Sequence, residues 1–134
     1  PASDNCLASG KRSYHTIIPG FLLRDGAAVG PFGVMGAFMQ PQGQTEILVN
    51  TLDYHMNPQE ALDAPRIQWI GGRRLELERE AGEAIADELR AIGHEVTVVD
   101  DRISMGRGQI IWRGEDGVYT AGTEPRCDGA VAAW

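Results

Sequence analysis

Cysteine is scarce in this chain of 134 residues, which has only Cys6 and Cys127, and its three histidines lie far apart. Two cysteines do not make a metal framework, and the histidines lack the close spacing that zinc ligands typically show. Phosphate-binding and dinucleotide-binding glycine patterns are also missing. The sequence therefore predicts no metal site, no cofactor and two free thiols.

Long apolar runs and basic clusters are missing as well. No stretch approaches the roughly 20 apolar residues that cross a bilayer. Twelve basic against 19 acidic residues give a formal net charge of −7, whereas nucleic-acid binding normally needs clustered lysine and arginine. We therefore expect neither a membrane nor a nucleic acid as a partner, and the compartment stays open between cytoplasm and periplasm.

The composition that remains is enough for one hydrophobic core. Hydrophobic residues make up 43% of the chain and charged residues 23%, which is typical of a globular domain of this length. The chain begins at Pro1 rather than at methionine, and its first 12 residues resemble a loop in composition. We expect residues 1–134 to be a single fragment of a longer protein, with residues 1–12 as a loop-like lead-in.

Strand patterns occur in three pairs, each separated by a turn signal that contains glycine, and these pairs predict hairpins. The paired ranges are 16–23 with 29–35, 67–70 with 74–80, and 109–113 with 118–121. Pro19 places the first strand at an edge or a bulge, because proline cannot donate to the ladder. Residues 94–99 give a further strand.

Three segments have the spacing of helices. Residues 42–54 and 81–92 carry apolar side chains three and four positions apart, and a short helix between them stops at Pro65. Asn57 suits the N-cap of the short helix and Pro58 its first position. Hairpins combined with blocks of helix predict an α+β fold with a mostly antiparallel sheet and flanking helices.

The glycine-bearing turn between residues 29–35 and 42–54 is the first candidate site. Successive backbone N–H groups at such a turn, here those of Gly36 and Ala37, can point into a cleft and stabilise an oxyanion. The alternative is a tight turn that uses glycine for steric reasons alone. Taken by itself, the pattern favours the plain turn.

His15 and Thr16, at the start of the first strand, form a second candidate pair. In a binding site they would donate hydrogen bonds to a carboxylate or a carbonyl, and Lys11 and Arg12 just upstream would add positive charge for an acidic substrate. Outside a site, Thr16 is simply a strand residue and His15 an exposed loop histidine.

Several segments, in order, resemble the small subunit of the γ-glutamyltransferase (γ-glutamyltranspeptidase) family. GKRSYHTIIPGFLLRDG at residues 10–26 resembles its GKRP segment, and FGVMGAFMQPQG at residues 32–43 resembles its strand-to-helix turn. LDYHMNPQEALDAPR at residues 52–66 is similar to its hallmark, which ends in APR, and EPRCDG at residues 124–129 to its closing segment. The resemblance covers nearly the whole chain and is strongest to a bacterial γ-glutamyltransferase-like branch.

The resemblance implies part of the α/β/β/α sandwich of an N-terminal-nucleophile hydrolase. Family precursors cleave themselves and expose a threonine whose hydroxyl attacks a γ-glutamyl amide such as glutathione. The α-amino group of that threonine serves as the base. An acyl-enzyme forms and is resolved by water or by an amino-acid acceptor.

The resemblance also assigns roles to the candidate residues. Gly36 and Ala37 match the glycine pair whose N–H groups form the oxyanion hole, and Ala37 keeps this donor provided that its φ stays negative. His15 and Thr16 match paired serines that hold the glutamyl α-carboxylate. Thr16 can still donate a hydrogen bond, whereas His15 changes both shape and charge, which puts the substrate in doubt.

The nucleophile of the family does not occur in this chain. All six threonines are internal, so none has the free α-amino group that would act as base. Residues 124–126 replace the family's Asp-Pro-Arg and Cys127 follows them; both are interpreted as structural variation. We expect the chain to supply the oxyanion hole and substrate pocket of an intact enzyme and to be inactive alone.

Two other functions stay open. The first is a related amidase that acts on another acyl group, such as a cephalosporin-type acylase, and the His15 substitution motivates it. The second is a non-catalytic module that packs against a partner. The expected partners are a γ-glutamyl small molecule and the rest of the small subunit with the large subunit, or a second copy, because half a sandwich leaves one sheet face uncovered.

Overall fold

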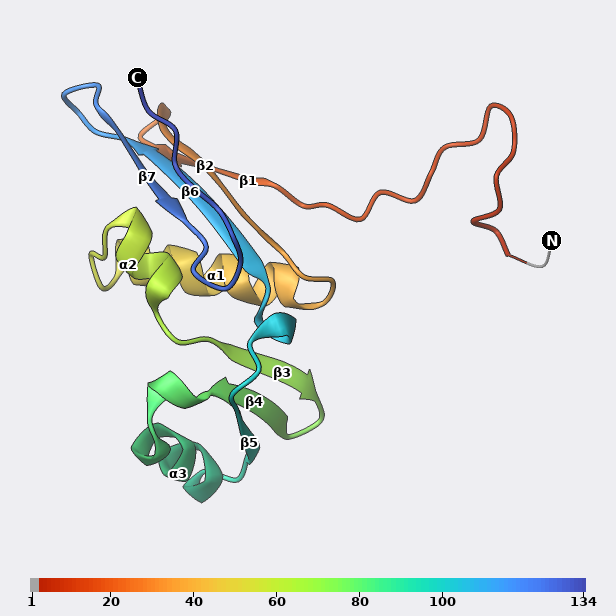
Figure 1. Cartoon of the computed structure of the whole chain (residues 1–134), viewed down its shortest axis with the longest axis vertical. Coiled ribbons are helices and arrows are strands. Elements are labelled where there is room, and N and C mark those ends of the chain that lie inside the picture. The colour runs from red at the N-terminus through yellow and green to blue at the C-terminus, as the bar shows by residue number, and fades with distance from the viewer. Residues whose placement is uncertain (1–2) are drawn as a thin grey trace.

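The computed structural model describes residues 3–134, in which seven strands form two sheets and three α-helices pack on them (Figure 1). The expected strand at Thr16 begins only at Gly20, and Pro1 lies outside the described residues. The strands are β1 (Gly20–Arg24), β2 (Ala27–Met35), β3 (Ile67–Gly71), β4 (Arg74–Glu78), β5 (Glu95–Val99), β6 (Arg107–Arg113) and β7 (Tyr119–Thr123), and the helices are α1 (Met39–Leu52), α2 (Pro58–Asp63) and α3 (Glu83–Ala91).

The larger sheet has the order β1-β2-β6-β7 and is antiparallel throughout. Alternate residues of its strands point to one face, where α1 and α2 cover them. The core there includes Phe32 and Val34 of β2, Ile110 of β6, Ile47 of α1 and Leu62 of α2. The pleat of the strands therefore separates a covered face from an open one.

The strand β1 is shorter than the sequence predicts. It lies at the edge of the sheet, and its register shifts between Leu22 and Leu23, as expected from Pro19. Residues 3–19 precede it and contain no helix or strand; they extend away from the body as an arm (Figure 1). The predicted strand over residues 16–19 is wrong because proline has no N–H to continue the ladder.

The first helix begins earlier than predicted, at Met39 rather than at Gln42. Pro41 lies in its first turn, where no intrahelical N–H is needed, so proline does not stop the helix. Gly43 faces β2, and a Cβ there would lie 2.9 Å from a methyl of Val34. The helix can approach the sheet this closely only because glycine occupies that position.

The second helix is capped as the sequence predicts. The side chain of Asn57 accepts hydrogen bonds from the N–H groups of Gln59 and Glu60, and the Glu60 carboxylate accepts from the N–H of Asn57. Pro58 takes the first helical position. This capping box satisfies donors that a helix end otherwise leaves unpaired.

The smaller sheet has the order β3-β4-β5 and lies at the other end of the molecule (Figure 1). Its β3–β4 pair is the predicted hairpin, but β4 and β5 are parallel and are joined through α3. The predicted strand over residues 74–80 ends at Glu78, because residues 79–81 form a 3₁₀ turn. Gly82, with φ of 87°, separates that turn from α3.

The fold class is therefore confirmed: helices flank sheets that are mostly antiparallel. Cys6 and Cys127 are free thiols, as expected. Among residues 3–134, no helix is both long and apolar enough to cross a membrane.

Replacing Gly122 with alanine should destabilise the fold, whereas the same change at Gly33 should not. A Cβ at Gly122 of β7 would lie 2.6 Å from the backbone of Pro58 at the start of α2, but a Cβ at Gly33 meets no atom within 4 Å. Overpacking of this kind costs about 1–3 kcal/mol. Urea unfolding followed by tryptophan fluorescence measures both variants, and equal losses would contradict this packing.

Candidate active-site elements

The turn between β2 and α1 carries the first pair of predicted site residues. It is closed by hydrogen bonds from the N–H of Met39 to the Gly36 carbonyl at 2.9 Å and from the N–H of Gln40 to the Ala37 carbonyl at 3.2 Å. Met39 is fully buried and anchors the turn below the sheet. The carbonyls of Gly36 and Ala37 are thus used to start the helix.

Both turn residues have unusual backbone conformations. Gly36 has φ of 145°, and a Cβ there would lie 2.8 Å from the Cα of Gly106, so this position requires glycine. Ala37 has φ of 50°. The condition set for Ala37 as a donor, a negative φ, is therefore not met, and the left-handed conformation costs alanine about 1–2 kcal/mol. These two φ values give the two successive peptide groups one particular orientation.

The N–H groups of this turn are open to a ligand. Gly36 is partly buried and Ala37 is exposed. Within residues 3–134, neither N–H donates to a side chain, and the backbone hydrogen bonds of the turn use its carbonyls. Two neighbouring amide donors at the start of a helix can bind a negatively charged oxygen.

The second predicted pair is brought to the same helix by two glutamines. Gln40 donates through Nε2 to the Thr16 carbonyl at 2.8 Å, and Gln44 donates to the Ile18 carbonyl at 2.6 Å. The arm therefore runs beside the first turns of α1. His15 and Thr16 are both exposed. No hydrogen bond constrains either side chain among the described residues.

Thr16 also lines a hollow of about 290 Å³ that the arm forms with itself. Lys11 and Arg12 line the same hollow, so the basic pair and the hydroxyl that the sequence singles out lie together. Gly36, Ala37 and His15 do not line it. The structure thus joins Thr16 to the positive charge and to the start of α1, and it leaves His15 at the surface.

A buried ion network stands behind the turn. Arg66 donates to Glu124 at 2.8 Å, and Arg126 donates to Glu124 at 2.7 Å and to Glu78 at 2.6 Å. All four side chains are almost completely buried. Because two arginines meet two carboxylates, the charges cancel and the network satisfies the condition under which buried charges are tolerated.

The network reaches the turn through Gly106. Arg66 donates to the carbonyls of Met105 at 2.8 Å and Gly106 at 3.0 Å, and Gly106 is the residue against which Gly36 packs. Glu124 in turn accepts from the N–H of Gly108 at 2.6 Å. The network therefore fixes the backbone that supports the turn.

Sequence reasoning missed this network, since it interpreted residues 124–126 only as structural variation. One signal was present: both arginines follow a proline, in Pro65-Arg66 and Pro125-Arg126. Proline restricts the residue before it and favours the end of the preceding helix or strand. Each arginine therefore comes just after the end of such an element, α2 for Arg66 and β7 for Arg126. The sequence positions of these arginines do not indicate that Glu78 and Glu124 are their partners.

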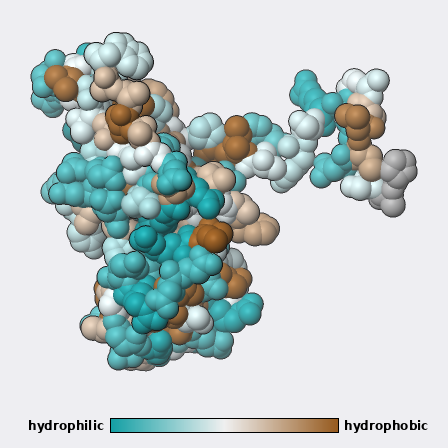
Figure 2. Space-filling view, in the orientation of Figure 1, coloured by the Kyte–Doolittle hydropathy of each residue, from teal (hydrophilic) through white to brown (hydrophobic). Residues whose placement is uncertain are grey.

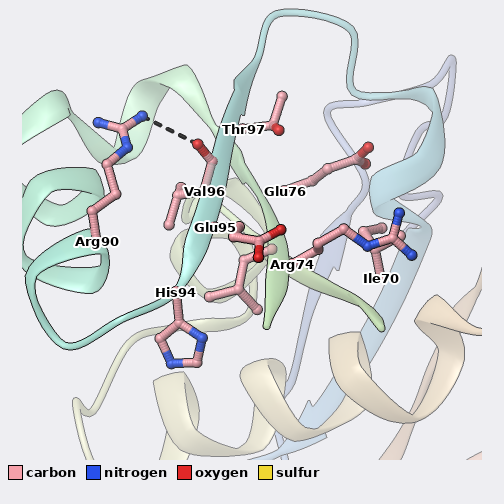
Figure 3. Close-up of a pocket in the computed structure, with 9 residues that line it drawn as sticks. Ile70, Arg74, Glu76, Arg90, His94, Glu95, Val96 and Thr97 are labelled. Carbon is pink, nitrogen blue, oxygen red and sulfur yellow. Dashed lines mark hydrogen bonds between the residues drawn. The ribbon is translucent and has the colours of Figure 1, made fainter. Parts of the chain in front are cut away.

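A separate hollow of about 440 Å³ lies on the smaller sheet (Figure 3). Arg74 and Arg90 line it together with Glu76 and Glu95, so its charges balance. Arg90 donates to the Val96 carbonyl at 3.2 Å and caps the edge strand β5. Nothing in it pairs a nucleophile with a base, and it contains none of the predicted site residues.

Comparisons with known proteins give the family of the chain. The sequence profile described as gamma-glutamyltranspeptidase matches residues 1–134. The chain belongs to this family. Over 135 residues it is 36% identical to the glutathione hydrolase-like YwrD proenzyme of Bacillus subtilis strain 168, covering 95% of this chain and 25% of that protein.

The chain also resembles solved structures, among them the following two. The cephalosporin acylase of Bacillus halodurans is 55% identical with a TM-score of 0.88, covering 100% of this chain and 25% of that chain. The gamma-glutamyltranspeptidase of Pseudomonas nitroreducens in complex with L-DON has a TM-score of 0.77 at 23% identity, covering 100% of this chain and 70% of that one. The fold is that of N-terminal-nucleophile hydrolases. The chain spans about a quarter of the length of the curated proenzymes that it matches.

Neutralising Glu124 should destabilise the fold most at neutral pH. Burial by itself raises the pKa of Glu124, but Arg66, Arg126 and the Gly108 N–H together lower it below its ordinary value. A carboxyl whose pKa is lower when folded adds stability above its unfolded pKa, and this stability disappears as the pH falls through the folded pKa. The variant Glu124→Gln should lose roughly 3 kcal/mol at pH 7 and progressively less towards pH 3.

Urea unfolding at pH 7, 5 and 3 measures this difference. The matched control is Asp100→Asn, which removes the partner of Arg79 in an exposed ion pair and should leave stability nearly unchanged. A Glu124→Gln deficit that grows on acidification would contradict the lowered pKa.

Proposed function

We propose that this chain is the C-terminal part of the small subunit of a γ-glutamyltransferase-like N-terminal-nucleophile hydrolase. The observation that carries the proposal is the strained turn at Gly36 and Ala37, whose N–H groups are open while the Arg66 network holds its supporting backbone. In the intact protein, the nucleophilic threonine comes from the part that lies outside this chain.

The roles follow from the chemistry of acyl transfer. When the threonine hydroxyl attacks a γ-glutamyl amide, the carbonyl oxygen becomes an oxyanion, and the N–H groups of Gly36 and Ala37 donate to it. The hydroxyl of Thr16 donates to the substrate's α-carboxylate, with Lys11 and Arg12 adding positive charge from the same hollow. Water or an amino acid then resolves the acyl-enzyme.

The partners that we infer are the rest of the small subunit and the large subunit. The open face of the larger sheet supports this, since Phe21, Leu23, Ile111 and Tyr119 are exposed on its strands. The arm also carries exposed apolar side chains, including Leu7 and Ile17, while most of the body is hydrophilic in this view (Figure 2). Apolar surface of this extent marks an interface; self-association is the alternative.

A second candidate function is acylase activity on a different acyl group. The observation that favours it is His15, which stands where a serine would help to hold the glutamyl α-carboxylate, together with the 55% identity to a cephalosporin acylase. An imidazole at this position suits an acyl group that lacks the α-amino acid end.

Substrate comparison on the full-length protein tests both functions. We expect release of p-nitroaniline from γ-glutamyl-p-nitroanilide, and none from the isolated 134-residue chain, because the nucleophile is absent from it. Faster turnover of a glutaryl anilide would favour the acylase. Turnover by the isolated chain, or none of either substrate by the processed full-length protein, would overturn the proposal.

Replacing Thr16 with valine in the full-length protein should lower kcat/KM for the γ-glutamyl anilide about 10-fold to 100-fold, because a bond to a charged group contributes about 1.5–3 kcal/mol. Thr16→Ser keeps the hydroxyl and should stay within about threefold. Since the side chain is exposed and only the Thr16 carbonyl is held by Gln40, both variants should keep the wild-type Tm. Equal activity of the valine and serine variants would remove Thr16 from the pocket.

A further inference from the structure

One partly buried carboxylate beside the ion network, that of Glu46, forms no ion pair among residues 3–134. In the ion network, Arg66 and Arg126 are balanced by Glu78 and Glu124. Glu46, on α1, lies close enough to Arg66, Arg126 and Glu78 to be influenced by their charges. It is therefore a third carboxylate beside two arginines that are already paired.

The two oxygens of Glu46 differ. Its Oε1 accepts a hydrogen bond from the N–H of Ile67 at 3.2 Å, which links α1 to the start of β3. Its Oε2 is shielded from solvent and has no hydrogen-bond partner among residues 3–134. Burial raises the pKa of Glu46 to about 7, and Glu78 adds to the rise, although the Ile67 N–H and the two arginines lower it. A shielded carboxylate oxygen without a hydrogen-bond partner is costly, and a cation or a proton would remove that cost.

Glu46 stands at the wall of a groove of about 490 Å³ between α1 and α3. The remaining walls are mostly apolar, and Ile85 and Tyr54 are exposed along them. The other acidic residue of the groove, Glu80, is half exposed and is paired with Arg102 at 3.5 Å. The groove thus combines apolar walls with one unneutralised carboxylate.

This combination specifies the chemistry of an occupant. A lysine or arginine side chain can lay its methylene stem along apolar walls and bring its cation to a carboxylate. The proenzyme that this chain matches is about four times its length. A segment from the rest of such a protein is therefore available to cover the groove.

We propose that the groove between α1 and α3 receives a segment of the remaining protein that presents apolar side chains and one lysine or arginine. The Glu46 carboxylate, whose Oε2 is shielded in this chain alone, turns towards that cation and pairs with it. The inference rests on the proposed function in one respect, that this chain works inside a longer protein. It adds a contact that lies away from the oxyanion turn and joins both sheets of this chain to the rest.

The direction in which one substitution, Glu46→Gln, changes Tm tests the proposal. If Glu46 meets a cation, its folded pKa falls below the unfolded value and ionisation stabilises the protein at pH 8. If it meets none, its folded pKa stays above the unfolded value, and ionisation destabilises the protein as the pH rises. Glu46→Gln keeps the shape and removes the charge, so its effect on Tm has opposite signs in the two cases.

The experiment uses the full-length protein, with Tm measured at pH 5 and pH 8 for wild type, Glu46→Gln and Glu80→Gln. We expect Glu46→Gln to lower Tm at pH 8 by about 2 °C or more, and Glu80→Gln, which removes the same charge from the rim of the groove, to change it little. A Tm of Glu46→Gln equal to or above that of wild type at pH 8 overturns the proposal. If n-butylammonium then stabilises wild type but not Glu46→Gln, the groove is open and takes free amines.

Activity is read separately in the same samples. If the wild-type protein turns over neither the γ-glutamyl nor the glutaryl anilide, that result counts against the proposed function alone. The difference in Tm between Glu46→Gln and wild type bears on the groove alone, because Glu46 does not contact the turn at Gly36 or the hollow at Thr16.

Discussion

The contact between two arginines and two carboxylates in the interior governs most of this structure. Arg66 follows α2 and Arg126 follows β7, yet both donate hydrogen bonds to Glu124. Arg126 also donates to Glu78 of β4. Each guanidinium also donates to backbone carbonyls: Arg126 uses all of its N–H donors, and Arg66 uses both of those on Nη1. Without this network the two sheets would be joined mainly by polar contacts from α1, and the backbone behind the turn would lose its support.

The arrangement explains how a chain with a modest apolar core can hold a strained turn. Ala37 adopts a left-handed conformation that alanine disfavours, and Gly36 packs directly on Gly106. Strain of this kind persists only where the surroundings over-determine the backbone. Here Met39 is buried below the turn and Arg66 holds Gly106 behind it, so the fold itself sets the orientation of the two amide groups.

Much of the fold could be predicted from the sequence. The features that could not be predicted depend on contacts between residues far apart in the chain. Hairpins, the N-cap at Asn57 and the helix after the turn follow from local chemistry and were predicted, whereas the reciprocal bond from Glu60 was not. The parallel β4–β5 pair was not, because periodicity fixes a strand but not its neighbour. The left-handed conformation of Ala37 could not be inferred either, and its neighbour Gly36 packs against Gly106, 70 positions away in the sequence. Glu46 looked like one more polar residue of a helix, and only the folded chain shows its second oxygen without a partner.

The way in which the arm is attached has a consequence for how this family diversifies. Gln40 and Gln44 grip the main-chain carbonyls of Thr16 and Ile18, not their side chains. The path of the arm is therefore indifferent to what residues 15 and 16 are. Residues 15 and 16 can therefore be substituted in the course of evolution without removing either of these hydrogen bonds to α1. A scaffold built in this way tolerates changes in the side chains of the arm while the turn at Gly36 and Ala37 keeps its support.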